Sequence, residues 1–290
     1  GTRSGKRRTY AQQVNGARAY FAWLAPYTLA NAQADVRKAV AICAHAEAFT
    51  LAVSRGGHAV PAVRIRRPGV PDPQRYGVWV QARQHAFETG SSWVVSGLLE
   101  WLTSSETRAV SLRQKAEIVV VPIMDVDSVQ AGHAGKEQRP VDYNRCWNDD
   151  PPHWPEVAAV QAACQAWEQA GRIDLFLDLH NCQPNDRAVF YYSLPDDLLT
   201  AAQRTNQAAF LAASETEITG PIPFQGRRDE RSTIGTVWRW VALDCRANNP
   251  VVALTLELPW NMPEATPAGY QKEGADLGRT IERYLRGNVR

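Results

Sequence analysis

Three residues of types that bind metal ions stand out in the sequence by their spacing. His85 and Glu88 are separated by two residues in the segment QHAFE, and His180 follows much later in DLHN. Two imidazoles and one carboxylate can hold a catalytic zinc ion while leaving a coordination position for water. Zinc-dependent hydrolysis is therefore the first hypothesis, although each residue taken alone is more commonly a satisfied side chain near the rim of a sheet.

The residues around His85 and Glu88 predict that a strand ends just before them and a helix begins just after. Residues 76–80 are apolar and β-prone, residues 90–92 are a typical helix start, and apolar residues recur at helical spacing over 94–102. Ligands of open α/β sheets bind at the carboxyl ends of strands. We therefore expect both residues to lie at such an end.

The sequence contains a second H-x-x-E pair, His153 and Glu156. This copy follows the loop-forming segment DDPP, has no strand before it and is interrupted by Pro155. We interpret it as a chance match.

Two further apolar segments predict strands that carry a polar residue near their ends. Residues 173–179 (IDLFLDL) lead to His180, and residues 251–258 (VVALTLEL) contain Glu257. A buried carboxylate without a partner is costly, so Glu257 is expected to face a cation or to have a raised pKa. Both conditions suit a general base. The alternative is an edge strand whose Glu257 points into solvent.

Asn144 and Arg145 are adjacent in the segment RPVDYNRCW, which follows the strand-like residues 117–124. A guanidinium fork beside an amide suits a planar carboxylate, such as the free C-terminus of a peptide. Taken alone, Asn-Arg is only a dipeptide in a loop.

The order of these motifs along the chain resembles the zinc carboxypeptidase family, the funnelins. Residues 82–94 are similar to the corresponding stretch of the cytosolic carboxypeptidase subfamily, and residues 20–28 resemble the junction there between a small β domain and the catalytic domain. The likeness spans about residues 20–286. It implies an α/β fold with a mixed central sheet and helices on both faces, with residues 24–290 as the catalytic domain. Residues 1–23 would be the end of a small β domain or an extension.

The resemblance also implies roles for the residues already singled out. It makes His85, Glu88 and His180 the ligands of one zinc ion per chain, Glu257 the general base, and Asn144 with Arg145 the carboxylate grip. The expected activity is that of a metallocarboxypeptidase, a hydrolase that removes C-terminal residues from peptides or protein tails.

Three features of the family have no clear counterpart here. For the arginine that stabilises the oxyanion, Lys136 lies nearest the expected position and Arg139 is the alternative. There is no tyrosine between Arg227 and Leu256, where the family has a capping tyrosine, so the expected substitutes are Ser232, Thr233, Trp238 or a tyrosine elsewhere. The sequence does not identify the pocket for the side chain of the last substrate residue. The region that usually lines it in the family contains Arg227, Arg228, Arg231 and Arg239. These arginines would suit an acidic C-terminal residue, but arginines are more commonly on the surface.

Two other functions stay open. A zinc-dependent deacylase of N-acyl amino acids, like the aspartoacylases, would keep the metal site, but the H-G-N-E motif usual in those relatives is absent. A catalytically inactive zinc-binding or peptide-binding module is the second alternative, and the presence of Glu257 argues against it.

Composition agrees with an ordinary enzyme domain. The 290 residues are 44% hydrophobic and 21% charged with a net charge of +2, which predicts one large core and no nucleic-acid or membrane partner. Neither a membrane-spanning stretch nor the apolar core of a signal peptide is visible, but the chain begins at Gly1, so a trimmed fragment is expected. The odd set of five scattered cysteines favours a reducing, cytoplasmic compartment. Helices are expected at 32–50, 155–170, 196–214 and 267–285, and a strand at 188–194.

Overall fold

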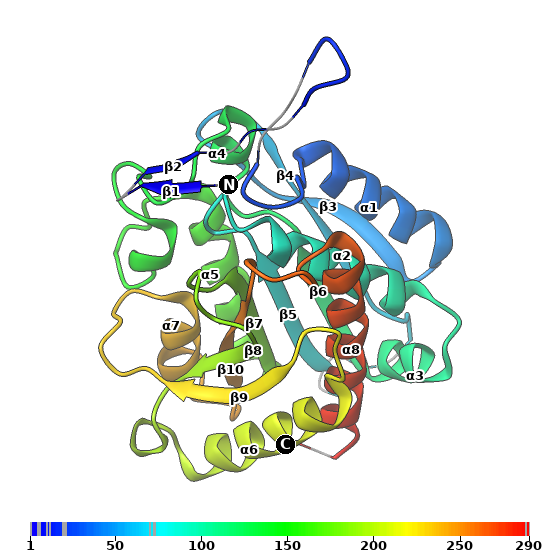
Figure 1. Ribbon diagram of the computed structural model, residues 1–290. Helices are drawn as coiled ribbons and strands as arrows, with labels where there is room; N and C mark the ends of the chain where they lie inside the picture. The colour runs from blue at the N-terminus through cyan, green and yellow to red at the C-terminus, as the bar shows by residue number, and fades with distance from the viewer. Residues whose placement is uncertain are drawn as a thin grey trace.

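The computed structural model describes residues 2–4, 7–9, 11, 13–18, 22–69, 71, 74–287 and 289. Its main feature is a mixed sheet of eight strands in the order β3-β4-β6-β5-β7-β10-β8-β9 (Figure 1). The strands are β3 (Ala46–Val53), β4 (Ala59–Ile65), β5 (Tyr76–Ala82), β6 (Ala116–Val121), β7 (Leu175–Asn181), β8 (Val189–Ser193), β9 (Phe224–Asp229) and β10 (Val252–Leu258). The four inner strands β6, β5, β7 and β10 run parallel, so their carboxyl ends meet at one edge.

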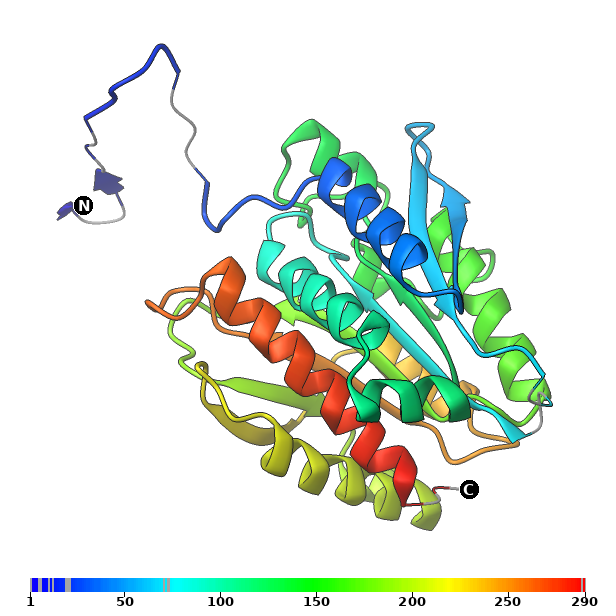
Figure 2. The same ribbon diagram turned by 90° about the vertical axis from the view of Figure 1, so that its right-hand side faces the viewer.

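Helices cover both faces of this sheet. They are α1 (Leu29–Ile42), α2 (Thr89–Thr103), α3 (Thr107–Lys115), α4 (Val126–Ala131), α5 (Pro155–Gln169), α6 (Ala201–Glu217), α7 (Val237–Asp244) and α8 (Pro267–Arg286). Figure 2 shows α2, α3, α6 and α8 over one face with α1 beside α2, while α5 and α7 lie behind the sheet. The predicted mixed sheet with helices on both faces is confirmed.

Strand β7 shows how the sequence divides the two faces. Leu175, Leu177 and Leu179 are fully buried in the apolar core with α2 and α8. Because side chains alternate along a strand, Asp178 and His180 point to the opposite face. The leucines of β7 thus pack the sheet against α2 and α8, and its polar residues lie on the opposite face of the sheet.

Strand β10 repeats this alternation in a register that collects polar residues. Thr255 of β10 is paired with Asp178 of β7, and Glu257 is paired with His180. Gln81, near the end of β5, is the other neighbour of Asp178. The carboxyl ends of three adjacent strands therefore present polar side chains on one face of the sheet.

Two local predictions need correction. The helix expected over 32–50 ends at Ile42, and residues 46–53 form β3, which pairs antiparallel with β4. The alanine-rich segment suggests a helix, but partners along β4 decide its conformation. In addition, β10 is flanked by β7 and β8, so the edge-strand alternative for Glu257 is wrong.

The N-terminal residues are described only in part. Strands β1 (Thr2–Ser4) and β2 (Arg7–Thr9) form a separate two-stranded antiparallel sheet. Much of the predicted β-domain remnant at 1–23, and part of the junction at 20–28, lies outside the described residues, so the boundary at residue 23 stays a prediction. Within the described part of the chain, no helix combines the length and apolar character needed to cross a membrane.

Candidate active site

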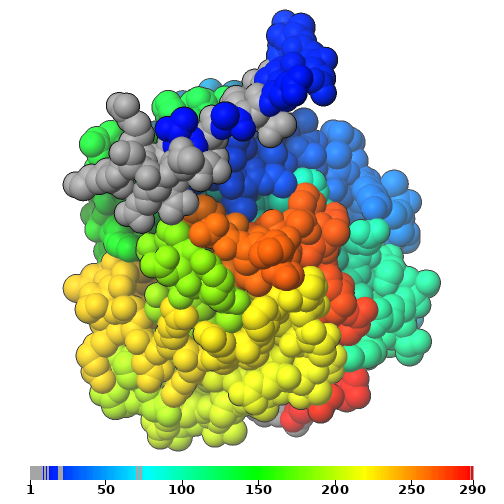
Figure 3. All heavy atoms as spheres, in the orientation of Figure 1, coloured from blue at the N-terminus to red at the C-terminus, as the bar shows by residue number. Residues whose placement is uncertain are grey.

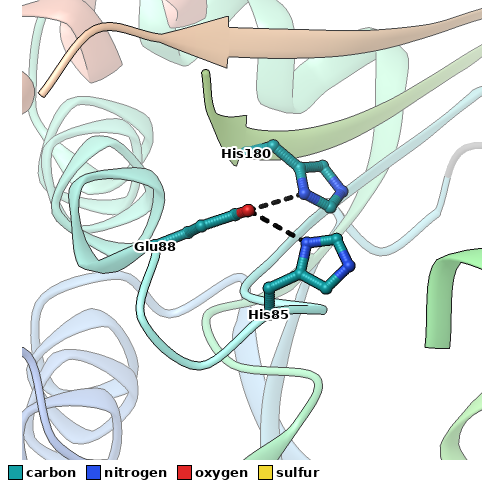
Figure 4. Close-up of side chains that lie close together, drawn as sticks. All are labelled: His85, Glu88 and His180. Atoms are coloured by element: carbon teal, nitrogen blue, oxygen red, sulfur yellow. Dashed lines mark hydrogen bonds and ion pairs between the residues drawn. The ribbon is translucent and has the colours of Figure 1, made fainter. Parts of the chain in front are cut away.

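The three predicted metal-binding residues meet at the carboxyl edge of the sheet. His85 and Glu88 lie in the turn between β5 and α2, and His180 lies one residue before the end of β7. Figure 4 shows both imidazoles turned toward the Glu88 carboxylate, with Nδ1 of His85 3.0 Å from Oε1 and Nδ1 of His180 2.7 Å from Oε2. All three side chains are buried, and their ligand atoms lie within 4.8 Å of one another.

A buried arginine holds the turn that carries His85 and Glu88. Arg83 has a positive φ of 66°, which is unusual for a residue other than glycine. Its Nε and Nη2 donate hydrogen bonds to the carbonyl of Ala86, and Nη1 donates to the carbonyl of Tyr27 and to Ser92. These contacts hold the left-handed conformation in place and so fix the turn.

Each imidazole is also bound on its far side by an aspartate. Nε2 of His85 lies 3.0 Å from Oδ1 of Asp142, and Nε2 of His180 lies 2.7 Å from Oδ2 of Asp178. Gln84 in turn donates to Oδ2 of Asp178 at 2.6 Å. Partners of this kind fix the orientation of a metal-binding imidazole, and here they leave both Nδ1 atoms facing Glu88.

The pKa values of the triad residues follow from the alternation of imidazoles and carboxylates. Burial by itself would lower the pKa of His85 and of His180, but the neighbouring carboxylates outweigh it and raise both pKa values. Burial opposes ionisation of Glu88, yet the two imidazoles hold its pKa well below the usual range. Three carboxylates thus surround two imidazoles in a buried space, and this nitrogen and oxygen donor set fits a zinc ion.

The triad forms part of a pocket of about 430 Å³. Four other residues with predicted roles also line this pocket: Lys136, Asn144, Arg145 and Glu257. Arg139, the alternative to Lys136, is exposed and does not belong to the lining. Segments around residues 185, 230 and 260 contribute to the lining, and they lie side by side, coloured yellow-green, gold and orange, on the face shown in Figure 3.

Glu257 lies next to His180 in the register of β10 and β7. The residue is half-buried, and its Oε2 is buried without a hydrogen-bond partner among the described residues. Burial raises the pKa of Glu257 to about 7, with the Glu88 carboxylate adding to the shift and His180 opposing it. A carboxyl group with this pKa can both accept and release a proton near neutral pH.

Asn144 and Arg145 belong to a short 3-10 helix, η2 (Tyr143–Arg145), which reaches the triad at His180. The Asn144 side chain is buried; its Oδ1 accepts a hydrogen bond from the Val237 amide at 3.2 Å, and its Nδ2 lies 3.3 Å from Nε2 of His180. Arg145 is exposed at the pocket and donates from Nη1 to the Asn144 carbonyl at 2.6 Å. Asn144 therefore ties α7 to the triad, and the guanidinium of Arg145 is accessible to a ligand.

Lys136 is the cation placed beside the triad. Its Nζ lies 3.0 Å from each ring nitrogen of His85 and 3.8 Å from Oε1 of Glu88. The preceding residue, Gly135, has a φ of 81°, and a Cβ there would lie 2.3 Å from the amide nitrogen of Ala86. Only glycine fits this close contact, which brings Lys136 to the site.

Sequence reasoning missed Asp142 and Asp178. Asp178 precedes His180 by two residues, and the period of a strand places both on one face, so this signal was available. Asp142 is 57 residues from His85 and lies in a loop, so no local pattern points to it. Of the residues considered for the missing tyrosine, Thr233 and Trp238 line the pocket, and Tyr192 of β8 is the tyrosine found there.

Comparison with known proteins adds the following findings. Residues 43–185 match the zinc carboxypeptidase family. Cytosolic carboxypeptidase 1 of Danio rerio is 29% identical over 188 residues, which are 60% of this chain and 16% of that protein. An uncharacterized protein of Zymomonas mobilis is 25% identical over 90% of this chain and 67% of its own length. The chain thus spans only a small part of the cytosolic carboxypeptidase that it matches.

Solved structures show the same fold. A metallo-carboxypeptidase from Burkholderia cenocepacia superposes with a TM-score of 0.77 at 23% identity, covering 91% of this chain and 71% of that one. A metallo-carboxypeptidase from Pseudomonas aeruginosa in complex with (2-guanidinoethylmercapto)succinic acid gives a TM-score of 0.75 at 24% identity, covering 92% and 71%.

Proposed function

Since the chain contains a domain of the zinc carboxypeptidase family over residues 43–185, we propose that it removes C-terminal residues from peptides or protein tails. The observation that carries this proposal is the composition of one pocket. The His85, Glu88 and His180 triad, the base candidate Glu257 and the carboxylate-binding candidate Arg145 all line it. A pocket of this composition would offer a metal-binding triad, a proton acceptor and an anion site to one substrate.

His85, Glu88 and His180 would hold the zinc ion through Nδ1, a carboxylate oxygen and Nδ1, respectively. When bound there, zinc supplies a Lewis acid that polarises the scissile carbonyl and makes water acidic near neutral pH. Asp142 and Asp178 keep the two imidazoles oriented for this role.

Arg145 is proposed to bind the free carboxylate of the substrate. Its guanidinium is accessible at the pocket, and the fork of N–H groups matches a carboxylate in geometry and charge. The Pseudomonas aeruginosa protein holds a succinic acid derivative, a ligand whose carboxylates would suit the same kind of guanidinium. Asn144 would support the grip by holding η2 against α7 and His180.

Glu257 is proposed as the general base. Its carboxylate would accept a proton from the attacking water and deliver it to the nitrogen of the leaving residue. The pKa of about 7 suits both transfers. Lys136, whose Nζ lies 3.0 Å from each ring nitrogen of His85, would stabilise the negative charge that develops on the carbonyl oxygen.

A cytoplasmic location and a peptide or protein substrate are proposed on narrower grounds. Several curated relatives are named cytosolic carboxypeptidases, and all five cysteines are buried and free. The domain boundary at residue 23 is proposed on the sequence resemblance alone.

The test is mass spectrometry of a mixed peptide library after incubation with the zinc-loaded protein. Stepwise loss of C-terminal residues by the wild type, retained in the control Glu137→Gln and lost in Glu257→Gln, supports a carboxypeptidase. Glu137 is exposed and does not line the pocket, so it is a matched glutamate for comparison. Cleavage of N-acyl amino acids without cleavage of peptides would identify a deacylase instead. Bound zinc without turnover of either class would identify a binding module.

A further inference from the structure

One wall of the pocket lies next to the proposed carboxylate grip. The loop between β9 and α7 packs against Arg145, because a Cβ on Gly235 would lie 2.3 Å from the Arg145 carbonyl oxygen. The Gly235 carbonyl accepts a hydrogen bond from the Trp147 amide, and the Val237 amide donates to Asn144. The chain from this loop into α7 is therefore fixed beside the grip.

This part of the pocket, which we call the side-chain wall, consists of residues from β8, β10, the loop and α7. They are Tyr192, Glu230, Thr233, Thr236, Trp238 and Thr255. The α-carboxylate and the side chain of a C-terminal residue branch from the same Cα atom. A residue whose carboxylate binds Arg145 must therefore place its side chain against a surface near Arg145. We assign the side-chain wall to this role, because its loop packs directly on Arg145 at Gly235.

The side-chain wall carries one charge, and that charge is negative. Oε1 of Glu230 accepts hydrogen bonds from the amide and the hydroxyl of Ser232, both at 2.6 Å, and from the Thr233 amide at 3.1 Å. These bonds lower the pKa of Glu230 and fix its carboxylate in place. The buried Trp238 and the half-buried Tyr192 supply apolar surface beside it.

The arginines of this region do not cancel that charge. Arg227 pairs with Asp196 at 2.9 Å and with Asp229 at 3.3 Å, and Arg228 pairs with Asp186 at 2.9 Å. Arg231 pairs with Asp197 at 2.7 Å, and Arg239 lies near the Arg231 carbonyl. None of the four arginines lines the pocket as described. Arg228 also makes a hydrogen bond to Tyr192 of the side-chain wall, but its guanidinium is already paired with Asp186. An acidic C-terminal residue would therefore have to compete with Asp186 for this arginine.

We propose that Glu230 selects substrates whose C-terminal residue has a long, positively charged side chain, such as lysine or arginine. The aliphatic stem would lie along Trp238 and Tyr192, and the cationic end would bind the Glu230 carboxylate. This inference rests on the proposed function, because it assumes that Arg145 binds the terminal carboxylate.

The test compares peptides that differ only in the last residue: lysine, norleucine or glutamate. Norleucine keeps the aliphatic stem of lysine and lacks the ammonium group. We expect kcat/KM for the lysine peptide to exceed that for the norleucine peptide by roughly 10–100-fold, the range for hydrogen bonds to charged groups. Glu230→Gln should bring this ratio close to one, mainly by lowering kcat/KM for the lysine peptide. The neighbouring Asp229→Asn, which alters an exposed aspartate outside the pocket, should keep the ratio.

A binding measurement separates failure of this inference from failure of the proposed function. Calorimetry with zinc-loaded Glu257→Gln should show tighter binding of the lysine peptide than of the norleucine peptide, and added Glu230→Gln should remove the difference. If that preference appears without turnover in the wild type, Glu230 selects a cation but the chain is not a carboxypeptidase. Equal kcat/KM and equal binding for the two peptides, or a preference for glutamate, would overturn the role of Glu230.

Discussion

The chain contains two H-x-x-E pairs whose glutamates are both buried. The two pairs differ in the pKa shift of the glutamate and in the burial and the partner of the histidine. Glu88 lies between two imidazoles that lower its pKa, whereas burial near Asp125 and Asp127 raises the pKa of Glu156. His85 is buried and contacts Glu88, whereas His153 is half-buried and pairs with Asp149 at 3.1 Å.

The difference comes from what precedes each pair. The strand β5 brings the first pair to an edge where β7 supplies a second imidazole, and so two histidines converge on one carboxylate. The second pair spans the start of α5, where Glu156 turns into the core beside Tyr143. A metal-binding spacing is therefore informative only where neighbouring strands complete the ligand set.

The largest expected contrast between the two pairs is in zinc binding. His180→Ala removes the ligand that only the first pair has, and we expect zinc affinity to fall by more than roughly 100-fold, beyond the effect of losing an outer partner. Peptide hydrolysis should then be lost. His153→Ala should leave both unchanged. Zinc content after dialysis, measured by plasma mass spectrometry, checks the prediction, with circular dichroism to confirm folding. Stoichiometric zinc in His180→Ala would remove His180 from the ligand set.

A smaller effect is expected from the cation beside the first pair. Lys136→Met removes a charge proposed to stabilise the oxyanion, and we expect kcat to fall by roughly 100-fold or more. Zinc content should be unchanged or higher, because a positive charge near His85 has been removed. Arg139→Met is the matched control, since Arg139 does not line the pocket. Equal losses in the two variants would assign the oxyanion role to neither residue.

The third contrast concerns the aspartates that pair with each histidine. Asp178→Asn weakens the orientation of His180, and we expect zinc affinity to fall by roughly 10–100-fold. Asp149→Asn changes the partner of His153 and should have no effect on zinc. Competition with a chelator of known affinity measures both. Unchanged zinc affinity in Asp178→Asn would show that the charge of Asp178 is not needed to orient His180. The hydrogen bonds from Gln81 and Gln84 to residue 178 would then be sufficient to hold its side chain.

Much of the site was predictable because it depends on local pattern. The period of two in β7 and β10 fixes the faces of His180 and Glu257, and the strand-to-helix boundary fixes the place of His85. Because β5, β7 and β10 pair in parallel, their carboxyl ends, which carry these residues, lie next to one another.

The remaining features depend on partners distant in the sequence. Asp142 reaches His85 only because Gly135 lets its loop pack on the turn at Ala86. The arginines near the pocket read as an anion site, but four aspartates, which the sequence does not single out, pair with three of them: Asp186, Asp196, Asp197 and Asp229. The strand β3 was mistaken for helix because its pairing with β4, rather than its own composition, determines its conformation.

The smallest expected effect is on stability, and it tests the opposite pKa shifts of the two glutamates. Because the pKa of Glu156 is raised in the folded protein, the folded state keeps a proton that the unfolded state releases as pH rises above about 4.5. Stability should therefore fall with rising pH until the folded pKa is passed, and Glu156→Gln should remove this loss. The variant should gain on the order of 1 kcal/mol relative to wild type between acid and neutral pH, or a few degrees in Tm.

Calorimetric melting from pH 4 to pH 8 measures this gain, with Glu100→Gln, an exposed glutamate of α2, as the control that should follow the wild type. A variant that instead loses stability as pH rises would mean that Glu156 is ionised and paired in the folded protein. In that case the glutamate of each H-x-x-E pair would be ionised. The second imidazole, which only the first pair has, would then be the difference between the metal site and the chance match.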